Sequence, residues 1–87
     1  MHEKGIMDCL MNKIIHLAQE EHAVKVVKVS VKLGALSHMS AQHFKEHFEM
    51  AAEGTIAQDA KIETEESQDI HDANATTVVL KSIDVTS

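Results

Sequence analysis

A segment that alternates apolar and polar side chains over residues 24–33 is the feature that most constrains the fold. Its apolar positions are Val27, Val29, Val31 and Leu33, and its polar positions are Lys28, Ser30 and Lys32. A period of two is typical of a strand that buries one face, because successive side chains point to opposite sides of a sheet. We therefore expect a sheet with one buried face and a second face that stays solvated or meets a partner.

Two helices are expected on either side of this strand in the sequence. The first covers residues 4–21, with apolar side chains at helical spacing. They are Ile6, Leu10, Ile14 and Leu17, with Met7, Met11 and Ala18 beside them. The second covers residues 41–53, between an N-cap residue, Ser40, and a C-cap glycine, Gly54. Its apolar positions are Phe44, Phe48 and Ala51 or Ala52.

Two more strands are expected after the second helix. Residues 60–66 alternate between an apolar side and a strongly acidic side, and residues 77–85 are rich in β-branched side chains. Residues 67–76 between them are polar and predict a loop. The order α-β-α-β-β predicts one α/β (α+β) domain over residues 1–87, with two helices packed on one face of a three-stranded mixed sheet. The first two strands, if adjacent, should be parallel, whereas the second and third should be antiparallel.

The composition excludes several classes of protein. A net charge of -6 argues against nucleic-acid binding. No run of eighteen apolar residues and no signal peptide are visible, so we expect a cytoplasmic protein that binds no membrane, either a monomer or a homodimer. A single cysteine, Cys9, excludes an internal disulfide. An enzyme is not expected, because the sequence shows no nucleophile–base arrangement and no phosphate-binding loop.

The first three residues, Met1-His2-Glu3, contain the atoms of a metal chelate. The terminal amine, the deprotonated His2 amide and the His2 imidazole can bind one ion as fused rings, and the Glu3 amide can complete a square plane. Four nitrogens in a plane suit Ni(II) or Cu(II) far better than tetrahedral Zn(II). The chelate requires residue 1 to carry the terminal amine, and as a bare motif it is weak.

The same residues, together with three further segments, resemble the HypA/HybF family of nickel metallochaperones for nickel–iron hydrogenase maturation. The segments are VSVKLGAL at residues 29–36, GTIA at residues 54–57 and VLKSIDV at residues 79–85. The helix with Phe44 and Phe48 also matches. The resemblance implies that Met1, His2 and Glu3 bind Ni(II) through the terminal amine, the His2 imidazole and the backbone amides of His2 and Glu3.

The resemblance further implies two partners, a hydrogenase-maturation GTPase (HypB-like) and the hydrogenase large subunit. It also exposes a departure, because the family inserts a zinc domain with two Cys-x-x-Cys pairs between its last two strands. Here that interval is the short loop around residues 67–76, and Cys9 is the sole cysteine. We therefore expect a short form of the family with no structural zinc. The alternative is a metal-independent protein-interaction module of the same fold that has lost nickel transfer.

Seven histidines in 87 residues raise the question of a second metal site. His43 and His47 are four residues apart and share a helix face, and His38 precedes that helix, so the three form a secondary candidate set. Solvated helix surface is the simpler interpretation of His43 and His47. Among the other histidines, His16, His22 and His71 are expected on the surface. Cys9 is expected to be a partly buried thiol, and Met7 and Met11 are expected in the core. The acidic run of Glu63, Glu65 and Glu66 is expected on an exposed strand face.

Overall fold

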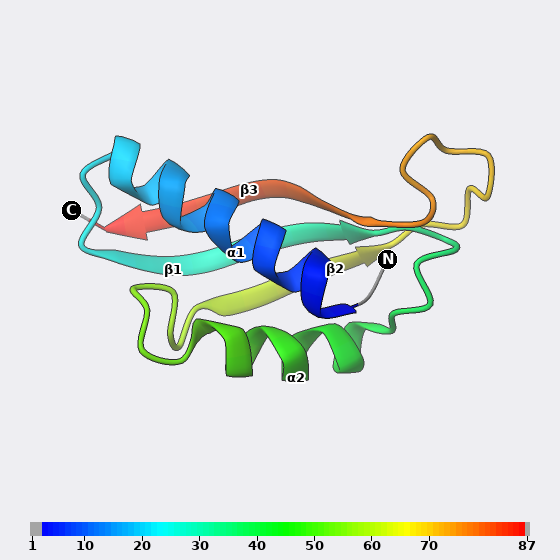
Figure 1. Cartoon of the computed structure of the whole chain (residues 1–87). Coiled ribbons are helices and arrows are strands. Elements are labelled where there is room, and N and C mark those ends of the chain that lie inside the picture. The colour runs from blue at the N-terminus through cyan, green and yellow to red at the C-terminus, as the bar shows by residue number, and fades with distance from the viewer. Residues whose placement is uncertain (1–2, 87) are drawn as a thin grey trace.

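The computed structural model describes residues 3–86, and Figure 1 shows their arrangement. The elements are α1 (Glu3–Glu20), β1 (Lys25–Leu33), α2 (Ala41–Ala52), β2 (Lys61–Glu66) and β3 (Val78–Thr86). The predicted order is confirmed, and each predicted boundary lies within one residue of the observed one. Neither helix in the described part of the chain is long and apolar enough to cross a membrane.

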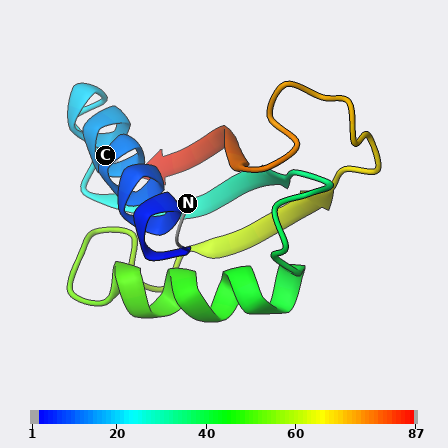
Figure 2. The same ribbon diagram turned by 45° about the vertical axis from the view of Figure 1, so that its right-hand side comes forward.

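The three strands form one mixed sheet in the order β2-β1-β3. β1 pairs with β2 in parallel, as predicted for strands joined through a helix, and with β3 antiparallel. β2 and β3 run in opposite directions, as expected, but they lie on either side of β1 and do not pair with each other. Figures 1 and 2 show α1 crossing the sheet and α2 running beside β2. The helices form one layer over the sheet. α1 contacts β3 and α2, and α2 contacts β2.

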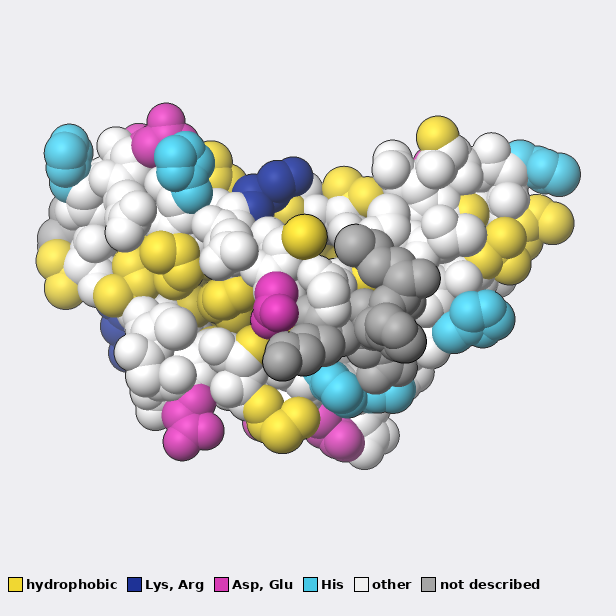
Figure 3. Space-filling view, in the orientation of Figure 1, with side chains coloured by type: hydrophobic (Ala, Val, Ile, Leu, Met, Phe, Trp, Pro, Cys, Tyr) yellow, Lys and Arg dark blue, Asp and Glu magenta, His cyan; other side chains and the backbone are white. Residues whose placement is uncertain are grey.

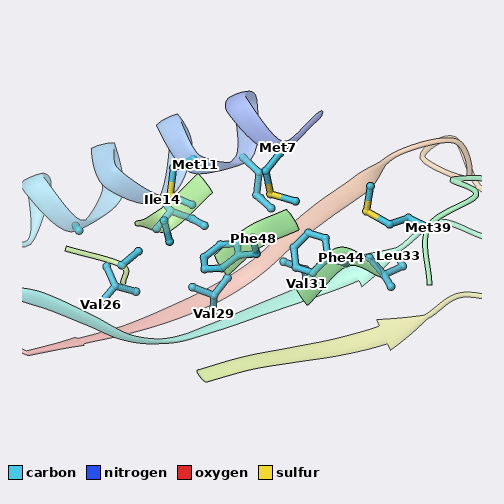
Figure 4. Packing of buried hydrophobic residues seen from close by; sticks show 14 residues of the cluster. Met7, Met11, Ile14, Val26, Val29, Val31, Leu33, Met39, Phe44 and Phe48 are labelled. Atoms are coloured by element: carbon cyan, nitrogen blue, oxygen red, sulfur yellow. The ribbon is translucent and has the colours of Figure 1, made fainter. Parts of the chain in front are cut away.

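The core lies between this layer of helices and the central strand. Val29, Val31 and Leu33 of β1 are at most 1% exposed, and Phe44 and Phe48 of α2 are equally buried. The two phenyl rings are tilted against each other with their centroids 5.9 Å apart. Figure 4 shows the methionines of α1 directed toward these rings, so the predicted role of Met7 and Met11 as core filling is confirmed. With so few aromatic residues, the two rings supply much of the core volume.

A β-bulge changes which valine of β1 faces the core. The register with β3 shifts between Val26 and Lys28, so Val26 is fully buried whereas Val27 is 38% exposed. The prediction that Val27 belongs to the buried face is therefore wrong. An extra residue in one strand of an antiparallel pair breaks the period of two, and it moves the preceding side chain to the opposite face.

A matched pair of alanine variants tests this bulge. Val26→Ala should lower the free energy of unfolding by about 2 kcal/mol, because it removes two buried methyl groups and leaves a cavity. Val27→Ala should change it by no more than about 0.5 kcal/mol, as expected for an exposed position. Urea denaturation of both variants measures the difference. A larger loss for Val27→Ala would show that the strand has the unbulged register.

The apolar side of α1 also differs from the prediction at its C-terminal end. Leu17 is 38% exposed, whereas Ala18 is fully buried. Leu10, Ile14 and Ala18 follow one another at steps of four residues, so they lie on the same side of the helix and form one buried stripe. The prediction that Leu17 continues the stripe is therefore wrong, and the small side chain of Ala18 lets the end of α1 approach the sheet.

The loop between β2 and β3 is bonded to the end of β1. The Gly34 N–H donates to the Thr77 carbonyl at 2.9 Å, and the Leu36 N–H donates to the Ala75 carbonyl at 2.7 Å. A Cβ at Gly34 would collide with the backbone of Ala75, so the close approach requires glycine at this position. Residues 67–77 lack regular structure, as predicted, yet Ala75 is only 4% exposed. The loop is thus a packed part of the domain.

Candidate metal site

The predicted nickel ligands lie at the start of the chain. Met1 and His2 are outside the described residues, and α1 begins with the backbone of Glu3. The first N–H groups of an α-helix have no carbonyl acceptor within the helix. The Glu3 amide nitrogen stands at this position, so a metal could take it without breaking a hydrogen bond of α1.

Two buried side chains anchor the start of α1. Ile6 is 6% exposed and Met7 is 3% exposed, and both follow Glu3 within about one helical turn. Figure 4 shows Met7 directed toward the rings of Phe44 and Phe48, and α1 contacts α2. The first turn of α1 therefore has a fixed position beside α2.

The two histidines of α2 lie against each other. The Nε2 atoms of His43 and His47 are 2.9 Å apart, and the ring centroids are 4.5 Å apart with the planes tilted by 49°. Both side chains are half-buried, so they are less solvated than the surface position expected for them. Ser40 sets the start of this helix as predicted, because its Oγ accepts the His43 N–H at 3.1 Å. Figure 3 shows histidine atoms side by side over α2.

The remaining histidines are dispersed over the surface. His38 is exposed in the turn before α2, and His16 is exposed on α1, where its Nε2 lies 3.2 Å from a Glu20 carboxylate oxygen. Among the side chains that the structure describes, those of residues 5–86, no three from histidine, cysteine, aspartate or glutamate gather closely enough to hold a metal ion. The structure thus brings together His43 and His47 of the secondary candidate set, but it does not bring His38 into a group with them.

Cys9 is exposed, which corrects the expectation of a partly buried thiol. Each residue of an α-helix is rotated by about 100° from the previous one, so Cys9 turns away from the buried Leu10 toward the solvent. The thiol borders a groove between α1 and β3 that is also lined by Ile6, Lys13 and Val79.

Lysines pair with the acidic side chains on the open face of the sheet. Lys28 of β1 lies 3.3 Å from Glu63 and 3.6 Å from Asp84, and the hydrogen bond with Glu63 is the main cause of its raised pKa. The Lys81 ammonium donates to Glu65 at 2.8 Å and holds the pKa of that carboxyl below its usual value. The expected exposed acidic face is therefore present, and lysines partly neutralise it.

Asp72 connects the loop to β1 and predicts a pH-dependent stability. The Asn74 N–H is the main cause of the lowered pKa of Asp72, and Lys32, at 3.4 Å, adds to it. A lowered pKa gives stability that is present above the usual aspartate range and is lost as the pH falls through the lowered pKa. Thermal unfolding from pH 6 to pH 2 should therefore show a loss of Tm below about pH 4 that is smaller in Asp72→Asn. An identical pH profile for the variant would contradict this role.

Comparison with known proteins places the chain among nickel-handling proteins. The family model described as "Hydrogenase/urease nickel incorporation, metallochaperone, hypA" matches residues 1–75. The hydrogenase maturation factor HypA of Methanococcus aeolicus is 35% identical over 69 residues, which cover 75% of this chain and 56% of the relative. The corresponding protein of Rhodopseudomonas palustris is 35% identical over 63 residues, which cover 72% and 56%. The chain thus spans about half the length of these curated relatives.

A solved structure shares the fold. The solution structure of the Ni metallochaperone HypA from Helicobacter pylori matches with a TM-score of 0.79 and 18% sequence identity. The match covers 100% of this chain and 99% of that chain. At this level of identity the likeness supports the α+β architecture of two helices and a three-stranded mixed sheet.

Proposed function

The chain belongs to the HypA family of hydrogenase/urease nickel-incorporation metallochaperones, and we propose that it binds Ni(II) at its N-terminus and delivers it to a nickel enzyme. The recipient in this proposal is a nickel–iron hydrogenase or another nickel enzyme under maturation. The observation that carries the proposal is the family match itself, which includes Met1, His2 and Glu3 and continues through α1, β1, α2 and β2 to Ala75. In this role the protein carries nickel as cargo and catalyses no reaction.

The proposed ligands are the Met1 amine, the His2 amide and imidazole, and the Glu3 amide. The position of Glu3 at the first turn of α1 supports this set, because its amide nitrogen is not needed by the helix. Two deprotonated amides carry two negative charges, so the complex with Ni(II) is neutral. A neutral complex avoids the repulsion that the positive end of the helix dipole exerts on a bare cation.

Protons compete with nickel for the amine, the amides and the imidazole, so the proposed site loses affinity as the pH falls. The same property makes the site suitable for delivery by ligand exchange. A recipient that offers its own ligands can displace the chelate one nitrogen at a time, and each nitrogen is reprotonated as it leaves. The proposed partners are a HypB-like maturation GTPase and the hydrogenase large subunit.

We further propose that this chain handles nickel without a structural zinc. Cys9 is the only cysteine, so one chain cannot supply the four thiolates of a cysteine zinc site. The loop at residues 67–77 passes directly from β2 to β3, and its bonds to Gly34 and Leu36 fix it to the end of β1. In this proposal, backbone hydrogen bonds hold the loop in place, whereas a bound metal would stabilise an inserted domain.

A maturation assay tests delivery. Cells that lack the native gene are supplied with the wild-type or the His2→Ala chain, and hydrogenase activity is measured at limiting and at excess nickel. We expect His2→Ala to lose most of the activity at limiting nickel and to regain it when nickel is added, because only delivery is impaired. Full activity of His2→Ala at limiting nickel would contradict the proposal and would favour a metal-independent interaction module.

A further inference from the structure

The Nε2 atoms of the two histidines of α2 share a hydrogen bond, and they are also as close as two ligands on one metal ion. Metal–imidazole bonds are about 2.0–2.1 Å long, so two nitrogens at 90° around one ion are about 2.9 Å apart. In a tetrahedral site the same two nitrogens would be about 3.3–3.4 Å apart. The observed separation of the His43 and His47 Nε2 atoms, 2.9 Å, matches the right-angled arrangement.

We propose that His43 and His47 form a second metal site, which binds Ni(II) through both Nε2 atoms in adjacent positions of an octahedron. With two imidazole ligands, the site is weaker and more labile than a four-nitrogen chelate. Binding requires both rings to carry their hydrogen on Nδ1. The hydrogen that one Nε2 now shares with the other therefore moves to Nδ1 through solvent, and no net proton is released.

The fold holds the two imidazoles in place before any metal arrives. The residues that follow each histidine, Phe44 and Phe48, are at most 1% exposed and fix the rotation of α2 about its axis. The Ser40 cap fixes the start of the helix one turn earlier. Both histidines are half-buried, which restricts their rotamers and lowers the entropy lost on binding.

The other pair with the same spacing lacks these features. His16 and Glu20 of α1 also lie four residues apart, but their side chains are 72% and 61% exposed. The two pairs therefore have the same spacing in the sequence. They differ in burial, and only the pair on α2 brings two imidazole nitrogens together. The proposed ligands on α2 include neither Met1 nor His2, so this site can be tested in a protein that lacks the His2 imidazole.

Nickel titration of the His2→Ala protein, followed by amide NMR, tests the second site without the terminal one. Octahedral Ni(II) is paramagnetic, so we expect amide signals of α2 to broaden first and those of β3 to remain sharp. Substituting His43→Gln or His47→Gln in this background should weaken the binding at least about tenfold, because a chelate becomes a single ligand. His16→Gln is the matched control and should leave the titration unchanged.

Two results would overturn the proposal. One is the absence of broadening over α2 in the His2→Ala protein, which carries no substitution on that helix and therefore does not depend on how the α2 variants fold. The other is broadening that persists in His43→Gln and His47→Gln proteins whose amide spectra show the native fold. Either result would mean that the two imidazoles hold no metal ion together. A protein with intact His2 and both glutamine substitutions keeps the terminal ligands, so failure of one site is distinguishable from failure of the other.

Discussion

Replacing His2 with alanine is expected to lower the Ni(II) affinity of the untagged protein at least about a hundredfold. The substitution removes the imidazole, and with it one of the fused chelate rings that hold the ion in the proposed site. Loss of a group that only supports a metal ligand already costs about 10–100-fold in affinity, and here a ligand itself is lost. Competition calorimetry with a chelator of known affinity measures the change.

Acetylation of the Met1 amine should have a comparable effect although every side chain remains. Acetylation converts the terminal amine into an amide, so the proposed chelate loses one of its four nitrogen ligands. His16→Ala is the matched control, because it removes an exposed histidine of α1. A wild-type affinity in both the His2→Ala and the acetylated protein would contradict the terminal site.

Truncation of Phe48 to alanine should have the largest effect on stability, a loss of about 3–5 kcal/mol in the free energy of unfolding. The ring is 1% exposed and belongs to one of the two phenylalanines of the chain, so a large cavity would open between α1, α2 and β1. A chain of this size has a total stability near the lower end of about 5–15 kcal/mol, so the variant should be partly unfolded at room temperature. Urea denaturation followed by circular dichroism measures the loss.

Met50→Ala on the same helix provides the control for Phe48→Ala. Met50 is 64% exposed, so its truncation should change the free energy of unfolding by about 0.5 kcal/mol or less. Similar losses in the two variants would mean that α2 presents a different face to the sheet. Because Met7 points to the same rings, Phe48→Ala should also loosen the first turn of α1, where the proposed nickel site begins.

The periodicity of the sequence was sufficient to predict the order of elements and the mixed sheet. Alternation at Val29, Val31 and Leu33 reports directly on side-chain direction, and a helix between two strands favours parallel pairing. The sequence could not show the bulge that buries Val26 in place of Val27, because a bulge is set by the pairing of β1 with β3 and not by either strand alone. Whether Leu17 or Ala18 is buried is likewise determined by how α1 packs against the sheet.

The candidate metal residues could also be predicted from the sequence only in part. Spacing alone placed His43 and His47 on one helix face, and the structure confirms that they are neighbours. Their Nε2–Nε2 distance depends on rotamers and burial, which no spacing rule contains. The terminal ligands Met1 and His2 stand on the family match and on chelate chemistry, since they lie outside the described residues.

The most direct measurement is the magnetic and optical state of the protein with one equivalent of Ni(II) bound, with the native Met1 verified by mass spectrometry. Four nitrogens in a plane give diamagnetic Ni(II), so the account predicts sharp proton NMR signals and a square-planar d–d spectrum at the first equivalent. Paramagnetic signals should appear only beyond that point, over α2. A paramagnetic six-coordinate ion at the first equivalent would contradict the terminal nickel site.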